Sequence, residues 1–482
     1  MNGSLHNLLT TLSWNSSHDT LFFAGDLLAK SDHSDSLAVW DYIYKNRINE
    51  QGRQVIYPVR GNHDQMVVQW RAWRDWFEGL VLPSPPRHHP ITSFLPFGMP
   101  SFASFLGADS PNDGSDRVAV RTGRDFVNLI EAEWVFASSS GDSIPPDAEE
   151  YVDVARKRAR GTWREHWWAR IPKTPKRGQD TKVWKMFSDH YWLAKDMDRE
   201  EAEWLMKDVP LVNWVSGLHT FVVHAGVLPG DPTLREDDER QPLARIPDYR
   251  QPANSAQVKS SIGRAEVIDQ KIAGYTNAQE PLGPGLSMSD VNGSADPSSN
   301  VTALRRLQER NILTEVPQNT DPWVVLNMRS VKKNGKVSRE MDQGKPGFGL
   351  PGEDYISDED GENGLELDDE AQRSKKHRPK KYELKCYPST VIYGHAATRG
   401  LDVKRWSFGL DTGCLYGRKL TALVLSRKAE PGSDGEDEDG EDEEGKEWAE
   451  ALMKKTKFGD ADAHIKARIV SVGCPNPDNE DD

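Results

Sequence analysis

The sequence has few cysteines and no long apolar run. Three cysteines occur among 482 residues, Cys386, Cys414 and Cys474, and none has another cysteine at metal-binding spacing. This low number excludes a disulfide-rich framework, and we expect a reducing compartment or indifference to redox state. No stretch of about 18 apolar residues occurs, so the sequence contains no candidate membrane span. The N-terminal residues also lack the basic flank and apolar segment of a signal peptide.

Charge is distributed unevenly along the chain. The formal net charge is −15, and 36% of the residues are apolar. Three runs, 353–370, 434–445 and 478–482, hold 23 acids and no Lys or Arg, which leaves +8 for the remainder. Acidic runs this dense repel themselves and are typically disordered. We therefore expect a mildly basic folded part that suits an anionic substrate, and no binding to nucleic-acid duplexes.

Short apolar runs alternate with helical patterns. We expect strands at 20–24, 55–60, 220–223, 323–327, 390–393, 407–410 and 421–425. Leucines at helical spacing predict a helix over 5–12, a second helix follows at about 36–46, and Trp70, Trp73 and Trp76 predict a core-facing stripe on a third. Strands that alternate with helices predict an α/β fold.

The pattern is interrupted by polar segments. We expect one domain over residues 1–428, with insertions at about 138–180, 231–320 and 334–382, of which the last is disordered. The acidic stretch 429–482 is expected to be a largely disordered tail. The ordered part should therefore be much shorter than the whole chain.

Four predicted strands are each followed by a polar motif. These are Gly25-Asp26, Gly61 to Asp64 (GNHD), His224 to Gly226 (HAG) and Gly394-His395. In layered α/β folds, functional groups gather just beyond the carboxyl ends of strands. We therefore expect the four motifs to meet in one site.

The residue types in these motifs favour a metal centre. Asp26, Asn62, His224 and His395 form a mixed set of oxygen and nitrogen ligands, which suits manganese, iron, cobalt or zinc better than calcium. A carboxylate such as that of Asp26 can bridge two metals about 3.5–4 Å apart, as in two-metal phosphoester hydrolases. Such ions polarise phosphoryl oxygens and lower the pKa of a bound water, which gives a hydroxide nucleophile.

Neighbouring residues supply the remaining chemistry. His63 is placed to protonate the leaving oxygen, and Asp64 to orient its imidazole. Arg60 and Lys30 are candidate contacts for the non-bridging phosphate oxygens. Gly25, Gly61 and Gly394 would shape the loops, and we expect Asp411 to order the loop beside His395 rather than to contact substrate. The implied partner is a phosphate-containing anion.

The same motifs resemble a known family. GDLLAK (25–30), RGNHD (60–64), HAG (224–226), GH (394–395) and GLDTGCLYGRKLTAL (409–423) are similar to those of the calcineurin-like metallophosphoesterases. Ala29, where Ser/Thr phosphatases have an Asp, resembles the branch of symmetrical diadenosine tetraphosphatase and fungal zinc-dependent endopolyphosphatase. The resemblance implies a layered β-sandwich flanked by helices. It also implies a hydrolase of polyphosphate or dinucleoside polyphosphates, with a phosphoprotein phosphatase as an alternative.

The chain departs from that family in two places. The family begins with a strand ending Gly-Asp-x-His-Gly, which binds the first of two metals, whereas this sequence starts at the following helix. We therefore expect an N-terminally truncated chain that binds one metal and is impaired as a hydrolase, or a phosphatase-like binding protein. Ser31-Asp32 replaces the usual Gly-Pro, which bears on the Lys30 contact. Localisation is open: cytoplasmic as the chain stands, or vacuolar if a membrane anchor precedes it.

Overall fold

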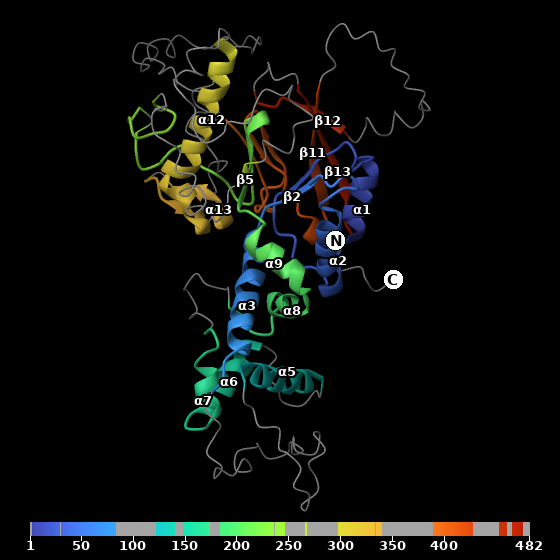
Figure 1. Ribbon diagram of the computed structural model, residues 1–482, viewed down its shortest axis with the longest axis vertical. Coiled ribbons are helices and arrows are strands. Elements are labelled where there is room, and N and C mark those ends of the chain that lie inside the picture. The colour runs from blue at the N-terminus through green and yellow to red at the C-terminus, as the bar shows by residue number, and fades with distance from the viewer. Residues whose placement is uncertain are drawn as a thin grey trace, which may run out of the picture. The chain divides into compact units, whose positions relative to one another are not determined.

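The chain folds into two compact units in a computed structural model (Figure 1). One unit comprises Met1–Gln65 and Arg199–Asp482, and the other comprises Met66–Asp198. The structure describes residues 2–28, 30–82, 122–139, 148–173, 184–235, 237–245, 266–267, 297–332, 334–339, 389–427, 453–459 and 465–475. Ala29, Cys386 and the three acidic runs lie outside these ranges. No helix within them has both the length and the apolar character needed to cross a membrane.

The larger sheet of the first unit has six strands in the order β5-β3-β4-β8-β10-β9. β4 pairs with β8 in parallel, and β8 pairs in parallel with β10. The strands are β3 (Val212–Val215), β4 (Thr220–Val223), β5 (Glu266–Val267), β8 (Thr390–Tyr393), β9 (Asp402–Lys404) and β10 (Ser407–Gly409). Three of them are strands that the apolar runs predicted, and their parallel pairing puts their carboxyl ends on one edge of the sheet.

A second, antiparallel sheet has the order β11-β13-β12, with β11 at Lys419–Arg427, β12 at Met453–Thr456 and β13 at Ile465–Gly473. Phe408 of β10, Phe458 and Ala467 of β13 form a buried cluster between the two sheets. The sheets therefore form a sandwich, and the α/β class is confirmed. The prediction of a disordered tail over 429–482 is wrong for β12 and β13, because the alternation in 465–473 buries one face of a central strand.

Among the described residues, this unit also contains two further strand pairs and five α-helices. β1 (Leu21–Phe23) and β2 (Ile56–Pro58) are parallel, whereas β6 (Ser330–Val331) and β7 (Val337–Ser338) form an antiparallel hairpin. The helices are α1 (Asn2–Thr11), α2 (His33–Asn46), α9 (Arg199–Lys207), α12 (Pro297–Glu315) and α13 (Pro322–Asn327). Short 3-10 helices are η2 (Ser216–Leu218), η3 (Pro317–Thr320) and η5 (Cys414–Tyr416). Helices thus accompany both sheets of the sandwich.

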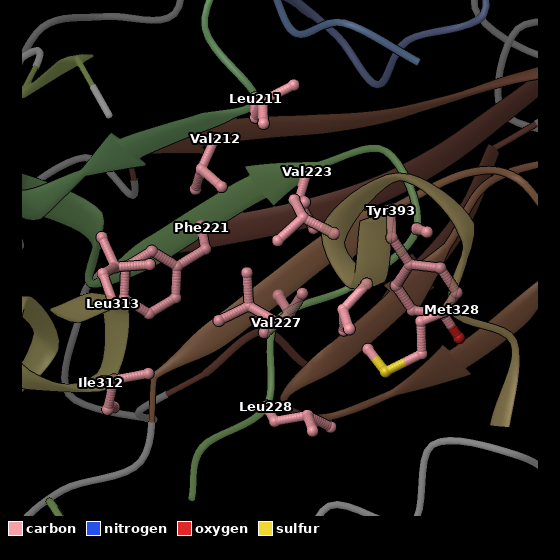
Figure 2. Packing of buried hydrophobic residues seen from close by; sticks show 14 of the residues in the cluster. Leu211, Val212, Phe221, Val223, Val227, Leu228, Ile312, Leu313, Met328 and Tyr393 are labelled. Atoms are coloured by element: carbon pink, nitrogen blue, oxygen red, sulfur yellow. The ribbon is translucent and has the colours of Figure 1, made fainter. Parts of the chain in front are cut away.

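The main core lies between the six-stranded sheet and helices α12 and α13 (Figure 2). Phe221 and Val223 of β4 lie in the same cluster as Ile312 and Leu313 of α12. A smaller cluster joins Leu8 of α1 to β13, so the predicted leucine stripe of the first helix is confirmed. Burial of apolar side chains on both sides of the sheet holds the strand ends in place.

Helices α2 and α13 begin at an Asp. Asp32 accepts a hydrogen bond from the Ser34 amide, so the Ser31-Asp32 pair starts α2 where the family has Gly-Pro. Asp321 accepts from the Trp323 amide, and a proline occupies the first helical position. The strand predicted at 323–327 is therefore wrong: a cap and a proline outweigh the β propensity of Trp-Val-Val. α12 was not predicted, since it falls in a segment with a weak apolar pattern.

The second unit is helical. Its elements are the greater part of α3 (Asn62–Glu78), α5 (Gly123–Ser139), α6 (Ala148–Ala159), α7 (Arg164–Trp168) and α8 (Asp189–Asp196). Trp70 and Trp73 are buried and pack edge to face, but Trp76 is 49% exposed. The predicted stripe is therefore wrong for Trp76, because six residues at about 100° per residue place it about 120° around the helix from Trp70. The buried Glu131 binds Arg74, Tyr191 and Lys195 at the centre of this unit.

A disulfide joins Cys414 to Cys474, with a Cα–Cα distance of 5.3 Å. It connects the loop after β10 to the segment just beyond β13. The sequence did not predict this pairing, which arises because the antiparallel pairing of β11 with β13 brings two distant positions together. One bond of this kind is still far from a disulfide-rich framework.

Candidate metal centre

The four strand-end motifs meet at one edge of the sandwich. His224 directly follows β4 and His395 lies two residues beyond β8, and these strands are parallel neighbours. Asp26 lies beyond β1, and Asn62 begins α3 after β2. Each apolar strand therefore delivers one polar side chain to the same place, as the sequence predicted.

The side-chain atoms converge on the imidazole of His224. Its Nε2 atom lies 3.0 Å from Asn62 Oδ1, 3.1 Å from His395 Nδ1 and 3.3 Å from Asp26 Oδ2. Its Nδ1 atom lies 2.9 Å from the carbonyl oxygen of Ala24. Because a carbonyl oxygen only accepts, the ring proton sits on Nδ1, and the lone pair of the neutral ring is on Nε2.

This donor set fits a cation. Ligand atoms of Asp26, His224 and His395 all lie within 4.8 Å of one another. A lone pair of His224 thus faces an amide oxygen and a carboxylate oxygen, which repel it unless positive charge lies between them. A proton can lie between only two of these atoms, whereas a divalent ion can be bound by donor atoms of all four side chains at once. The residues present therefore fit a divalent metal, and the set of nitrogen and oxygen donors suits several first-row ions.

Without an ion, a proton on His224 supplies the positive charge. Burial lowers the pKa of His224, but the charge of Asp26 outweighs it and the pKa is raised above its ordinary value. Burial raises the pKa of Asp26, but the nearby charge of His224 outweighs it and the pKa falls below its ordinary value. Burial and the charge of His224 lower the pKa of His395 to about 2, so its imidazole is neutral. A carboxylate that stays ionised beside a neutral imidazole is ready to bind an ion without losing a proton.

Backbone conformation and close packing shape the loop that carries Asp26. Gly25 and Asp26 both have left-handed backbones, with φ of 84° and 56°. A Cβ atom on Gly61 would lie 2.1 Å from Asp26 Oδ1, so only glycine fits there. At Gly394 a Cβ atom would meet nothing closer than 3.5 Å, and the residue acts through its amide, which donates to the His224 carbonyl.

Asp64 is fully buried and holds this loop. One carboxylate oxygen accepts from the amides of Leu27 and Leu28, and the other accepts from those of Asp26 and Gly61. Burial and the charge of Asp26 raise the pKa of Asp64 to about 6. The contacts thus give Asp64 a role that the sequence did not indicate, which is to position the Asp26 turn. Its predicted role in orienting His63 stays a prediction.

Comparison with known proteins agrees with this geometry. Residues 1–170 match the family model described as calcineurin-like phosphoesterase. This part of the chain, about a third of its length, is similar to the calcineurin-like phosphoesterases. The match includes Asp26, Asn62 and His63, whereas His224 and His395 lie beyond it. A search of curated proteins and a search of solved structures each returned no match to the chain.

The two predicted phosphate-binding residues, Arg60 and Lys30, differ in their surroundings. Arg60 is partly buried, and its Nη1 atom donates to Gln65 Oε1 at 3.2 Å. Its Nε atom has no hydrogen-bond partner among the described residues. Lys30 is exposed and has a left-handed backbone, with φ of 63°. Arg60 is therefore the better placed of the two to hold an anion in a fixed orientation.

His63 and Asp411 both lie close enough to Asp26 for their charges to interact. The His63 amide donates to Asp26 Oδ1 at 2.9 Å, and the charge of His63 contributes to the lowered pKa of Asp26. Asp411 accepts from the Gly413 amide at 3.1 Å, and burial raises the pKa of Asp411. Both positions are compatible with the roles expected of them, which are acid for His63 and loop ordering for Asp411.

Sequence reasoning missed two arginines beside His395. The Nε atom of Arg329 lies 3.3 Å from His395 Nε2, and the Arg329 carbonyl accepts from Arg399 Nη2 at 2.8 Å. The backbone carbonyl of Asn327 also faces His395 and favours its protonated form. Cationic groups thus lie on the His395 side of the site as well as at Arg60. The available signal was the cluster of basic residues at 329–339, which contains no acid.

Proposed function

We propose that this protein hydrolyses phosphoanhydride bonds of inorganic polyphosphate or of dinucleoside polyphosphates. We further propose Asp26, Asn62, His224 and His395 as the metal ligands. The observation that carries the proposal is the convergence of Asn62, His395 and Asp26 side-chain atoms on His224 Nε2, with Arg329 beside His395. A divalent ion bound there would polarise a phosphoryl oxygen and lower the pKa of a bound water.

The chain's own residues position the substrate. Arg329 lies beside His395, and Arg60 directly precedes the Gly61–Asn62 loop, and each guanidinium can bind two non-bridging oxygens of one phosphoryl group. Their charges offset the negative charge that develops on those oxygens in the transition state. Asp64 holds the Asp26 turn, and the Ala24 carbonyl holds the His224 ring, so the site needs little rearrangement before reaction.

His63 is the proposed proton donor to the leaving oxygen. Its backbone is fixed by the hydrogen bond to Asp26, while its side chain is half-buried and so keeps access to substrate. An imidazole has the only side-chain pKa that is near neutral without large perturbation, which suits an acid at physiological pH. The leaving group of a phosphoanhydride is itself a phosphate, so the proton is needed less than for an alkyl ester.

The experiment compares metal content with hydrolysis. The purified chain is loaded with manganese, cobalt or zinc, and the ions per chain are counted by mass spectrometry. Release of phosphate is then measured from polyphosphate, a dinucleoside tetraphosphate and a phosphopeptide. We expect hydrolysis of the first two and little of the third. Faster release from the phosphopeptide would contradict the proposed substrate class.

Three variants separate the proposed roles. His63→Ala should keep the metal and lose most hydrolysis, about 100-fold or more for a lost general acid. Asn62→Ala should lose the metal as well. His166→Ala, which changes an exposed histidine in the helical unit, should behave as the wild type. Wild-type turnover in His63→Ala would contradict its role as the acid.

A further inference from the structure

The β6–β7 hairpin begins and ends at an arginine. The Arg329 amide donates to the Ser338 carbonyl at 2.9 Å, and the Lys332 amide donates to the Lys336 carbonyl at 2.9 Å. Gly335 supplies the turn with φ of 78°. These hydrogen bonds pair residues 329–332 with residues 336–338 next to the metal centre.

This hairpin is strongly basic. Residues 329–339 include five Lys or Arg and no Asp or Glu. Lys332 and Lys336 are exposed, whereas Val331 and Val337 pack against the main core. The turn also approaches Pro232, and the adjoining Asp231 carboxylate accepts hydrogen bonds from Thr233 and Gln318. The hairpin therefore presents positive charge while its apolar side is buried.

The base of the hairpin is joined to the metal centre. Arg329 Nε lies 3.3 Å from His395 Nε2 at one end. At the other end, Arg339 Nη2 donates to Asn327 Oδ1 at 2.9 Å, and the Asn327 carbonyl faces His395. The Arg339 guanidinium lies 5.4 Å from the ring centroid of Trp323. Positive charge thus begins beside His395 and continues out along both strands.

The length of this charged surface exceeds one phosphate group. A strand rises about 3.3 Å per residue, so Lys332 lies about 10 Å further along the strand than Arg329. A single phosphoryl group at the metal centre cannot reach both positions. A chain of linked phosphates can, because every unit carries negative charge.

We propose that the β6–β7 hairpin is a binding subsite for an extended inorganic phosphate chain, beyond the phosphoryl group that reacts. This inference rests on the proposed function. It narrows the proposed substrates to long chains of inorganic polyphosphate. A single-stranded nucleic acid is the less suitable polyanion, because the hairpin strands carry no aromatic side chain on which bases could stack. The subsite makes affinity depend on chain length.

The test measures binding in the presence of a chelator, where no hydrolysis occurs. The full chain is titrated with end-labelled long-chain polyphosphate, with tripolyphosphate and with oligothymidylate at several salt concentrations. The double variant Lys332→Ser/Lys336→Ser should bind the long chain about ten-fold more weakly than the wild type. When the logarithm of affinity is plotted against the logarithm of salt concentration, the slope for the double variant should be smaller in magnitude by about 1.4. This value assumes that each lost lysine contributes as it does on single-stranded nucleic acid.

Two matched variants serve as controls. Lys454→Ser/Lys455→Ser changes two exposed lysines on β12, in the other sheet, and should keep wild-type affinity. Lys332→Arg/Lys336→Arg keeps the charge and should also keep the affinity. Equal losses in the β12 and hairpin variants would overturn the proposal, since they would show a nonspecific effect of net charge. Tighter binding of oligothymidylate than of polyphosphate would also overturn it.

Failure of this inference can be told apart from failure of the proposed function. If the chain hydrolyses polyphosphate but the hairpin variant binds long chains as tightly as the wild type, the proposed subsite is overturned and the proposed function stands. Lysine-dependent binding of long chains without hydrolysis under any metal would support the subsite and contradict the proposed enzyme.

Discussion

The Nε2 atom of His224 lies 3.1 Å from the Nδ1 atom of His395, although 171 positions separate the two residues. Neighbouring parallel strands bring them together, and the Ala24 carbonyl sets which nitrogen of His224 carries the proton. The site is therefore assembled by the fold from distant segments, and its chemistry depends on backbone groups as much as on the side chains themselves.

Metal binding should stabilise the chain through this pair. At an ion concentration a hundred-fold above Kd, binding to the native state alone adds about 2.7 kcal/mol to the free energy of unfolding. We expect manganese to raise the melting temperature of the wild type and to have little effect on His224→Ala or His395→Ala. Differential scanning fluorimetry with and without a chelator measures this. An equal shift in His395→Ala and wild type would exclude His395 as a ligand.

Asp64→Asn should destabilise the protein despite its small change in shape. An amide nitrogen in place of one carboxylate oxygen would face two backbone N–H groups, which leaves buried donors unsatisfied. We expect a loss of about 2–4 kcal/mol in the free energy of unfolding. Chemical denaturation provides the measurement. Asp32→Asn is the control, because Asn caps a helix as well as Asp and the change should stay within about 0.5 kcal/mol.

The Glu131 network should make stability depend on acid pH. Burial raises the pKa of Glu131, but hydrogen bonds from Lys195, Tyr191 and Arg74 outweigh it and hold the pKa below the ordinary 4.5. The folded state thus binds fewer protons than the unfolded state. The stabilisation that ionised Glu131 contributes is therefore present above about pH 4.5, and it is lost as the pH falls through the folded-state pKa of Glu131.

Glu131→Gln tests this dependence. The variant should lose about 2–3 kcal/mol near neutral pH, since Arg74 loses its buried counter-ion Glu131 and keeps only its ion pair with Glu78. Its unfolding free energy should also change less than that of the wild type between neutral and acid pH. Glu203→Gln alters an exposed ion pair on α9 and should keep the wild-type profile. An unchanged pH profile in Glu131→Gln would show that other carboxylates govern the acid response.

The Cys414–Cys474 bond should contribute about 2–4 kcal/mol to the free energy of unfolding. Reduction by a phosphine should lower the wild-type value by this amount and leave Cys414→Ser/Cys474→Ser unaffected. Cys386→Ser should keep the response of the wild type. Thiol counting under denaturing conditions measures the bond directly, and three free thiols before reduction would contradict it.

The strand ends were predictable because burial and polarity change abruptly there. TLFFA, VIYPVR and TFVV are apolar runs, each followed at once by Gly, Asn, Asp or His. Residues 323–327 were predicted as a strand because Trp-Val-Val has a high β propensity. They form a helix instead, which begins at Asp321 and Pro322. β13 was missed because it follows an acidic run, and average composition concealed its alternating pattern.

Other parts of the site depend on tertiary structure. The sequence contains Arg329, but its approach to His395 requires α13 and the β6–β7 hairpin to be in place. The buried position of Asp64 follows from four amides that belong to two separate turns. Local patterns therefore identify candidate ligands, whereas the groups that position them come from contacts between segments distant in sequence.

The Cys414–Cys474 bond closes the chain into a covalent ring that encloses the acidic run 434–445. A protease that cuts one peptide bond within this ring would produce two polypeptides that remain attached to each other. β13, the central strand of its sheet, would stay linked to the loop after β10. Nicked and intact protein would then migrate alike on a denaturing gel until a reductant is added.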